Sequence, residues 1–174
     1  QPAGTTQGRL SSALRARLNG LSAKSGLETP SKRLGLSGAS LARAKHCLAS
    51  AIYFEARGEP LDGQIAVGQV VLNRVFTGFY PDDVCAVVYQ NAGRFRSCQF
   101  TFACDGTPSS IKEPEAWTLA ETMASELLSG ALYQDQVAGA THFHAIYVHP
   151  VWTKEMQEKA KFGSHIFYRP KQWP

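Results

Sequence analysis

Several features that mark common protein classes are missing from the sequence. The four cysteines include no Cys-x-x-Cys pair, which argues against a zinc ribbon and against a thioredoxin-like redox motif. No apolar run approaches the length of a membrane-spanning helix, and no internal repeat is present. At 174 residues, the chain has the size of a single domain that can bury a core.

Acidic side chains are almost absent from the first 45 residues. This segment carries eight Lys or Arg side chains and one acidic residue, Glu28, for a net charge of +7. Residues 46–174 carry ten basic and thirteen acidic side chains, for a net charge of −3. The basic character therefore belongs to the start of the chain. A clustered basic surface is not expected on the remainder, and we predict no nucleic-acid partner.

Residues 1–39 are predicted to form a basic arm or linker, because Ser, Gly, Thr and Pro are frequent there. Within the arm, four leucines at helical spacing predict a short basic amphipathic helix that Gly20 would end: Leu10, Leu14, Leu18 and Leu21. A helix this short is not stable alone in water. We expect it to dock on its own domain or on a protein partner rather than on a membrane.

The next segment predicts a helix that carries a carboxylate on its apolar face. Ser40 can serve as the N-cap, and small or apolar residues then recur at helical spacing. Glu55 lies seven residues after Leu48 and therefore falls on the same stripe. Gly58 and Pro60 end the helix just beyond it.

The position of Glu55 predicts a raised pKa. Burial and the negative end of the helix dipole both disfavour the charged carboxylate. A carboxylic acid that stays protonated near neutral pH can act as a general acid. The alternative interpretation is a structural Glu whose head group pairs with Arg57 or Arg74.

The rest of the chain predicts further helices and a few strands. Residues 62–75 are apolar almost all round and predict a buried helix, in which Gly68 permits close approach to the Glu55 helix. The other predicted elements are helices at 81–89, 113–130 and 154–161 and strands at 100–102, 141–148 and 165–168. Together these elements indicate an α+β, helix-rich domain with a small β-sheet or hairpin.

One stretch of sequence resembles a known family. Residues 53–60 (YFEARGEP) lead into 63–67 (GQIAV) and 71–75 (VLNRV), and shorter matches continue to 163–167 (GSHIF). This pattern resembles the SleB-type, spore-cortex-lytic family of bacterial cell-wall hydrolases, over roughly residues 41–169. The departures are Gly68-Gln69, where small apolar residues are usual, and a cysteine-bearing segment around Cys98 and Cys104.

The resemblance implies a lysozyme-like catalytic domain, which we place at residues 40–174, and cleavage of peptidoglycan glycan strands. It also implies that Glu55 is the catalytic acid. Hydrolytic glycosidases usually need a second carboxylate, yet none of the candidates has a compelling pattern: Glu59, Asp62, Asp105 and Asp135. Lytic transglycosylases, which the family's activity resembles, can use one Glu as acid and then base. The choice between transglycosylase and muramidase stays open.

Four cysteines in an envelope enzyme suggest two disulfides, for which three connectivities exist. We predict Cys47–Cys85, which would join the first and third helices, and Cys98–Cys104, which would close a short loop. The alternative is four reduced thiols in a cytosolic protein. We expect the protein in the periplasm or cell envelope, with secretion or attachment to a particle left open.

Four further residues are predicted to contact the glycan: Gln99, Thr101, His144 and Tyr147. A zinc-dependent peptidoglycan peptidase is the main alternative, because His142-x-His144 on a strand places two imidazoles on one face. The upstream His-x-x-x-Asp that such enzymes add is absent, since Ser50 follows His46 at that spacing. We therefore predict no metal and no cofactor. A non-catalytic peptidoglycan-binding module, the third interpretation, would not need a perturbed carboxylate.

Overall fold

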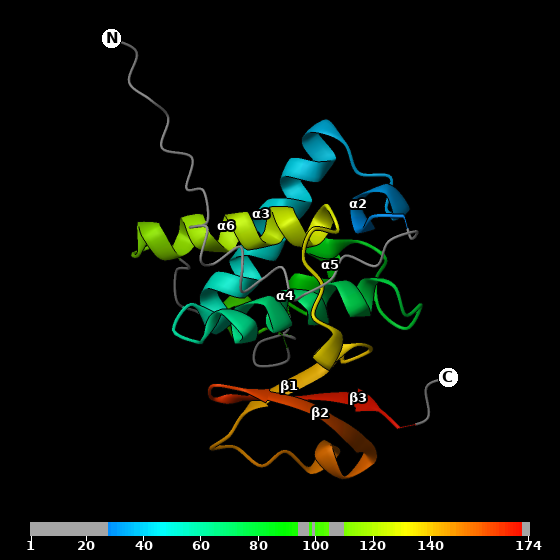
Figure 1. Ribbon diagram of the computed structural model, residues 1–174, viewed down its shortest axis with the longest axis vertical. Helices are drawn as coiled ribbons and strands as arrows, with labels where there is room; N and C mark the ends of the chain where they lie inside the picture. The colour runs from blue at the N-terminus through cyan, green and yellow to red at the C-terminus, as the bar shows by residue number, and fades with distance from the viewer. Residues whose placement is uncertain (1–27, 94–97, 99, 105–109, 172–174) are drawn as a thin grey trace.

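The structure, a computed structural model, describes residues 28–93, 98, 100–104 and 110–171. Helices occupy one end of the molecule and a small antiparallel sheet the other (Figure 1). The helices are α2 (Pro30–Arg33), α3 (Gly38–Ala56), α4 (Leu61–Val75), α5 (Val84–Val88) and α6 (Pro114–Leu128). The strands, in the order β1-β3-β2, are β1 (His142–Ala145), β2 (Met156–Phe162) and β3 (His165–Pro170). None of the described helices is long and apolar enough to span a membrane.

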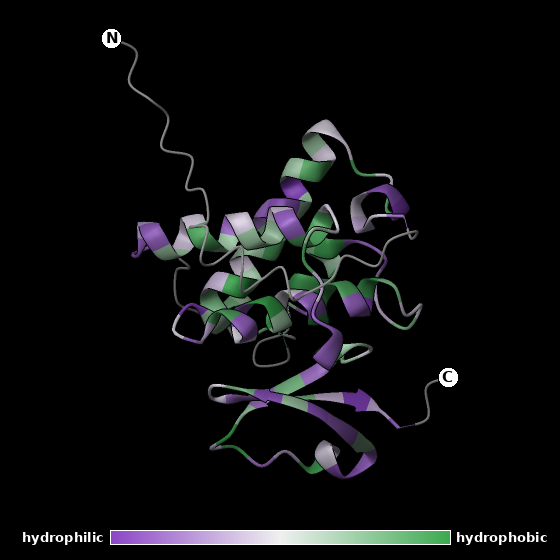
Figure 2. Cartoon of the chain, in the orientation of Figure 1, coloured by the Kyte–Doolittle hydropathy of each residue, from purple (hydrophilic) through white to green (hydrophobic). Residues whose placement is uncertain are grey.

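Short 3₁₀ turns connect these elements: η1 (Thr101–Ala103), η2 (Asp135–Val137) and η3 (Val151–Glu155). Hydrophobic residues are concentrated in the helical part, whereas the sheet is largely hydrophilic (Figure 2). The predicted α+β, helix-rich class with a small sheet is therefore confirmed.

Helix α3 begins three residues earlier than predicted. Its N-cap is Ser37, not Ser40. The Ser40 hydroxyl instead accepts a hydrogen bond from the Ser37 backbone N–H at 3.0 Å, in the manner of a capping-box residue. The helix ends at Ala56, so Glu55 lies in its last turn as expected.

Helix α4 separates two hydrophobic clusters, which explains why it is apolar almost all round. Ile65, Val71 and Leu72 belong to the cluster shared with α3, α5 and α6. Val67 and Val70 belong to a second cluster that reaches β3. A Cβ at Gly68 would lie 3.0 Å from Ile52 Cδ1 of α3 and 2.5 Å from Leu127 Cδ1 of α6. Close packing of α4 against α3 therefore depends on glycine at this position.

Helix α6 is fixed to α3 through Tyr53. The tyrosine hydroxyl accepts hydrogen bonds from the backbone N–H groups of Lys112 and Glu113, at 3.0 and 3.1 Å. These N–H groups precede the helix, and Pro114 occupies its first position. The Trp117 ring packs edge-on against Tyr53 with a centroid distance of 5.7 Å, so it belongs to the helical core.

The predicted helix at 154–161 is wrong, because residues 154 and 155 end turn η3 and the rest of the segment forms strand β2. Its pairing register with β3 shifts between Glu158 and Ala160, as in a β-bulge. A bulge inserts one residue and interrupts the two-residue alternation that reveals a strand in sequence. Ala160 and Phe162 of β2 pack on the second cluster.

The predicted strand at 100–102 is also wrong, because residues 101–103 form η1. Phe100 is buried, and Phe102 stacks on Phe54 of α3 with ring centroids 4.8 Å apart. The Cα atoms of Cys98 and Cys104 lie 6.0 Å apart, whereas six extended residues would span about 20 Å. A compact turn satisfies this closure.

Both predicted cysteine pairs are bonded in the structure. Cys47 of α3 and Cys85 of α5 are buried, with Cα atoms 5.2 Å apart, and the other pair is Cys98–Cys104. The predicted amphipathic helix of residues 10–21 lies outside the described residues. In the described part of the arm, Leu34 and Leu36 pack against the helical core.

Candidate active site

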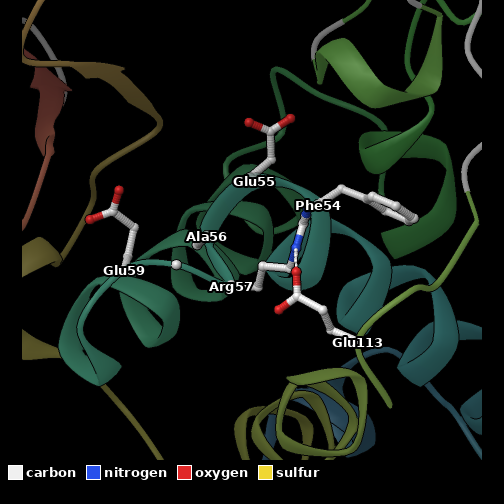
Figure 3. A pocket seen from close by; sticks show the side chains of 7 residues that line it. Phe54, Glu55, Ala56, Arg57, Glu59 and Glu113 are labelled. Carbon is white, nitrogen blue, oxygen red and sulfur yellow. Dashed lines mark hydrogen bonds and ion pairs between the residues drawn. The ribbon is translucent and has the colours of Figure 1, made fainter. Parts of the chain in front are cut away.

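Glu55 projects from the last turn of α3 as a half-buried side chain. Burial raises the pKa of its carboxyl group to about 7, although a hydrogen bond from the Thr101 backbone N–H partly opposes this shift. Figure 3 shows Glu55 and Glu59 directed to the same side of the ribbon. The carboxyl group of Glu55 is therefore poised between its two protonation states near neutral pH.

The arginines that could have neutralised Glu55 are engaged elsewhere. Arg57 pairs with Glu113 at 3.0 Å, as Figure 3 shows, and the Arg74 Nε donates to the Thr141 carbonyl at 2.7 Å. Within the described residues, no ion pair joins Glu55 to either arginine. The interpretation of Glu55 as half of a structural ion pair therefore has no support in the geometry.

Glu55 opens onto a pocket of about 460 Å³ between the helices and the sheet. The pocket gathers the predicted residues Glu55, Thr101, His144 and Tyr147, which come from α3, η1, β1 and the loop after β1. Its remaining lining residues are Arg74, Phe100, His142, Phe143, Ala145, Trp152 and His165. Gln99, the other predicted contact, lies outside the described residues.

Aromatic rings form the wall of this pocket on the sheet side. Trp152 lies with its ring centroid 5.1 Å from His142 and 5.7 Å from His144. Tyr168 stacks on His144 at 5.2 Å, and its hydroxyl lies 2.9 Å from His144 Nε2. Sequence reasoning missed Trp152, because the turn η3 that carries it shows no periodic pattern. Its only signal was an aromatic residue near the His142-x-His144 pair.

The pocket histidines are held in defined states. Burial, aided by the Arg74 cation, lowers the pKa of His142 to about 4. Burial also lowers the pKa of His165, despite the opposing effect of Glu59. His144 Nδ1 lies 2.7 Å from the Ala145 carbonyl oxygen, which can only accept, so this nitrogen carries a proton. Within the described residues, no three His, Cys, Asp or Glu side chains gather in a metal-binding cluster.

The carboxylate of Glu59 has a structural role, because it is bound by Ser164. Ser164 donates to it from its backbone N–H, at 2.9 Å, and from its hydroxyl. Although partial burial acts to raise the pKa of Glu59, these bonds and nearby His165 lower it below its ordinary value. A Cβ at Gly163 would lie 2.6 Å from Pro60 Cδ, so the hairpin turn needs glycine to approach. Glu59 thereby ties the β2–β3 turn to the end of α3.

The other described candidates for a second carboxylate do not line the large pocket. Asp62 and Asp135 are exposed, and Asp105 lies outside the described residues. Glu59 and Glu113 instead line a smaller open pocket of about 260 Å³ on which Glu55 also borders (Figure 3). Among the described carboxylates, Glu55 alone lines the large pocket.

Comparison with known proteins places this chain in a family. The sequence model of the Cell Wall Hydrolase family matches residues 58–168, which is more than half of the chain. The chain belongs to the SleB-type family of cell-wall hydrolases. The match begins three residues after Glu55, so it does not itself cover the carboxylate.

Curated relatives of this SleB-type chain are spore cortex-lytic enzymes. The one from Halalkalibacterium halodurans is 34% identical over 121 residues, which cover 69% of this chain and 33% of that protein. The one from Oceanobacillus iheyensis is 30% identical over 127 residues, which cover 69% and 39%. The chain thus spans well under half the length of these relatives.

Two solved catalytic domains share the fold. The catalytic domain of the Bacillus cereus SleB protein aligns with a TM-score of 0.55 and 27% identity, over 74% of this chain and 91% of that chain. The catalytic domain of the germination-specific lytic transglycosylase SleB from Bacillus anthracis aligns with a TM-score of 0.56 and 27% identity, over 76% and 97%. The predicted lysozyme-like architecture therefore matches that of SleB catalytic domains.

Proposed function

We propose that this chain cleaves the β-1,4 bond between muramyl and glucosaminyl residues of peptidoglycan, with Glu55 as its general acid and base. The observation that carries the proposal is the half-buried Glu55 carboxyl group, whose pKa is raised to about 7 beside an open pocket. Such a group can hold a proton for the leaving oxygen and take one back later in the reaction.

The reaction needs only one carboxylate if the nucleophile belongs to the substrate. Glu55 donates its proton to the glycosidic oxygen as the bond from that oxygen to muramyl C1 breaks. The resulting carboxylate then removes the proton of the muramyl 6-hydroxyl, whose oxygen attacks C1 and closes a 1,6-anhydro ring. No water has to be positioned, because the attacking group is intramolecular. The absence of another described carboxylate from the large pocket favours this transglycosylase route over hydrolysis.

The predicted contact residues have roles that follow from their places in the pocket. The Thr101 backbone N–H stabilises the Glu55 carboxylate once the proton has left. His144 and the largely exposed Tyr147 supply polar and aromatic surface for the sugar rings. We add Trp152 to this set, since its ring lines the same wall.

The peptidoglycan polymer lies outside the cytoplasm, and so would its enzyme. The buried Cys47–Cys85 disulfide supports an oxidising compartment such as the periplasm or cell envelope. The other predicted partner, a protein or domain surface that docks the arm of residues 1–39, stays a prediction.

Mass spectrometry of the soluble products from purified sacculi tests the proposed function. We expect muropeptides that end in 1,6-anhydromuramic acid. Reducing muramic ends would keep Glu55 as the acid but replace the internal nucleophile with water. Free stem peptides with intact glycan strands would overturn the proposal in favour of a peptidase.

A further inference from the structure

Arg74, near the C-terminal end of α4, is a buried cation without a carboxylate partner in the part of the chain that the structure describes. Its exposed fraction is 2%, and it lines the same pocket as Glu55. No ion pair involves it within the described residues. Burial lowers the pKa of its guanidinium to about 10, which leaves it charged at neutral pH. Buried charges are costly and are normally paired, so this arginine needs an explanation.

The guanidinium interacts with two walls of the pocket, one that includes Phe100 and one that begins at Thr141. Its Nε donates to the carbonyl of Thr141, the residue directly before β1, at 2.7 Å. Its Cζ lies 5.7 Å from the centroid of Phe100, the residue directly before η1, and 4.9 Å from that of Tyr80. These distances permit cation–π attraction, which is strongest for desolvated cations. Its Nη1 is buried without a hydrogen-bond partner among the described residues.

Each of these walls carries part of the site. The Phe100 wall continues into Thr101, whose backbone N–H donates to Glu55. The Thr141 wall continues into His142 and His144 of β1. A shift of either wall would change the distance between Glu55 and the groups that face it.

We propose that Arg74 is the positioning residue of the Glu55 site, holding the Phe100–Thr101 segment and the start of β1 in the register that aims the Thr101 N–H at the carboxylate. This inference rests on the proposed function of Glu55, which it deepens by naming the residue that holds the N–H donor in place beside the acid. Arg74 acts through Thr101 and need not touch the substrate.

Besides Glu55 and Arg74, four titratable side chains face the pocket from the elements packed around it: His142, His144, Tyr147 and His165. The pKa of Glu55 responds to burial and to the Thr101 N–H. Loss of the N–H bond should therefore raise this pKa further, and the pH at which activity declines should rise with it.

Replacement of Thr101 by proline provides the reference state. Phe100 has φ −115° and ψ 126°, which a following proline tolerates, and proline suits the first position of η1. Thr101→Pro thus removes the N–H, and Thr101→Ala controls for the lost side chain. We expect Thr101→Pro to raise the Glu55 pKa, measured from the carboxyl ¹³C chemical shift, while Thr101→Ala leaves it unchanged.

The decisive comparison adds Arg74→Met, which keeps an unbranched apolar stem but removes the charge and the donors of the guanidinium. We expect a higher Glu55 pKa, a kcat at least about 10-fold lower with little change in KM, and no further pKa rise when Thr101→Pro is added. Arg43→Met, at an exposed arginine paired with Asp83, is the matched control and should change neither the Glu55 pKa nor kcat.

A folded Arg74→Met protein with an unaltered Glu55 pKa would overturn the inference, as would pKa shifts that add in the double variant. If Arg74→Met does not fold, Arg74→Lys and Phe100→Leu provide the same test, since each weakens one of the two wall contacts. The pKa is read without turnover, so failure of this inference is distinguishable from an error in the catalytic assignment of Glu55.

Discussion

The carboxyl group of Glu55 couples activity to stability. Its pKa rises from 4.5 to about 7 on folding, so the folded state binds the proton more tightly. The stability that protonation contributes is fully present below pH 4.5 and is lost as pH rises through about 7. Catalytic power at this residue is therefore gained at the expense of stability at alkaline pH.

Glu55→Gln should lose this pH dependence. A shift of this size corresponds to about 3 kcal/mol of unfolding free energy between acid and alkaline pH, so the variant should be more stable than wild type at pH 8. Urea unfolding at pH 4.5 and pH 8 measures the effect, with Glu115→Gln on the exposed start of α6 as the control. An identical pH profile for wild type and Glu55→Gln would show that the carboxyl group is not perturbed.

Single residues differ in how far the sequence could reveal them. Glu55 could be predicted because its environment is local, set by helical spacing from Leu48 and by the helix end. The spacing could not reveal the importance of Arg74 or Trp152. Their significance depends on Thr141, Phe100 and the β1 rings, which lie distant in sequence.

At the scale of elements, the β2–β3 hairpin is held to α3 by the contact between Glu59 and Ser164. The next residue, His165, lines the pocket with Glu55. Because the pKa of Glu59 is lowered from 4.5 on folding, its stabilising effect is fully present above pH 4.5 and is lost as pH falls through the lowered pKa. The hairpin thus depends on a charged carboxylate outside the large pocket.

Glu59→Gln should lower the melting temperature at pH 7, and its difference from wild type should shrink as the pH is lowered below 4.5. Ser164→Ala should act in the same direction, and the double variant should be little worse than either single variant, since one contact is lost in each case. Additive effects of the two substitutions would indicate that Glu59 and Ser164 stabilise the protein independently.

The elements could be predicted where their pattern was regular. Helices α3, α4 and α6 follow helical spacing with recognisable ends. Strand β2 could not be predicted, because the bulge near Lys159 interrupts its alternation. The sequence of turn η1 is typical of a strand because Phe100 and Phe102 alternate with polar residues, and only the closure between Cys98 and Cys104 requires the segment to be compact.

At the scale of the whole molecule, the Cys47–Cys85 bridge secures the helix that presents Glu55. It closes a 38-residue separation and is buried in the helical core. Its replacement by two alanines should cost about 2–4 kcal/mol and lower the melting temperature on the order of 10 °C. Activity should fall together with stability.

The Cys98–Cys104 pair provides the comparison, since it spans a separation of only 6 residues. Its replacement by alanines should change the melting temperature less, because a short loop restricts the unfolded chain less. Differential scanning calorimetry of both double variants makes the comparison. Equal losses would contradict the view that the longer bridge has the larger structural role.

The central claim is that Glu55 donates the proton to the glycosidic bond. The most direct test is the rate at which Glu55→Gln releases soluble muropeptides from sacculi, with Glu115→Gln as control and circular dichroism to verify the fold. The account predicts a loss of at least ~10²-fold for Glu55→Gln and wild-type activity for the control. Near-normal turnover by a well-folded Glu55→Gln protein would contradict it.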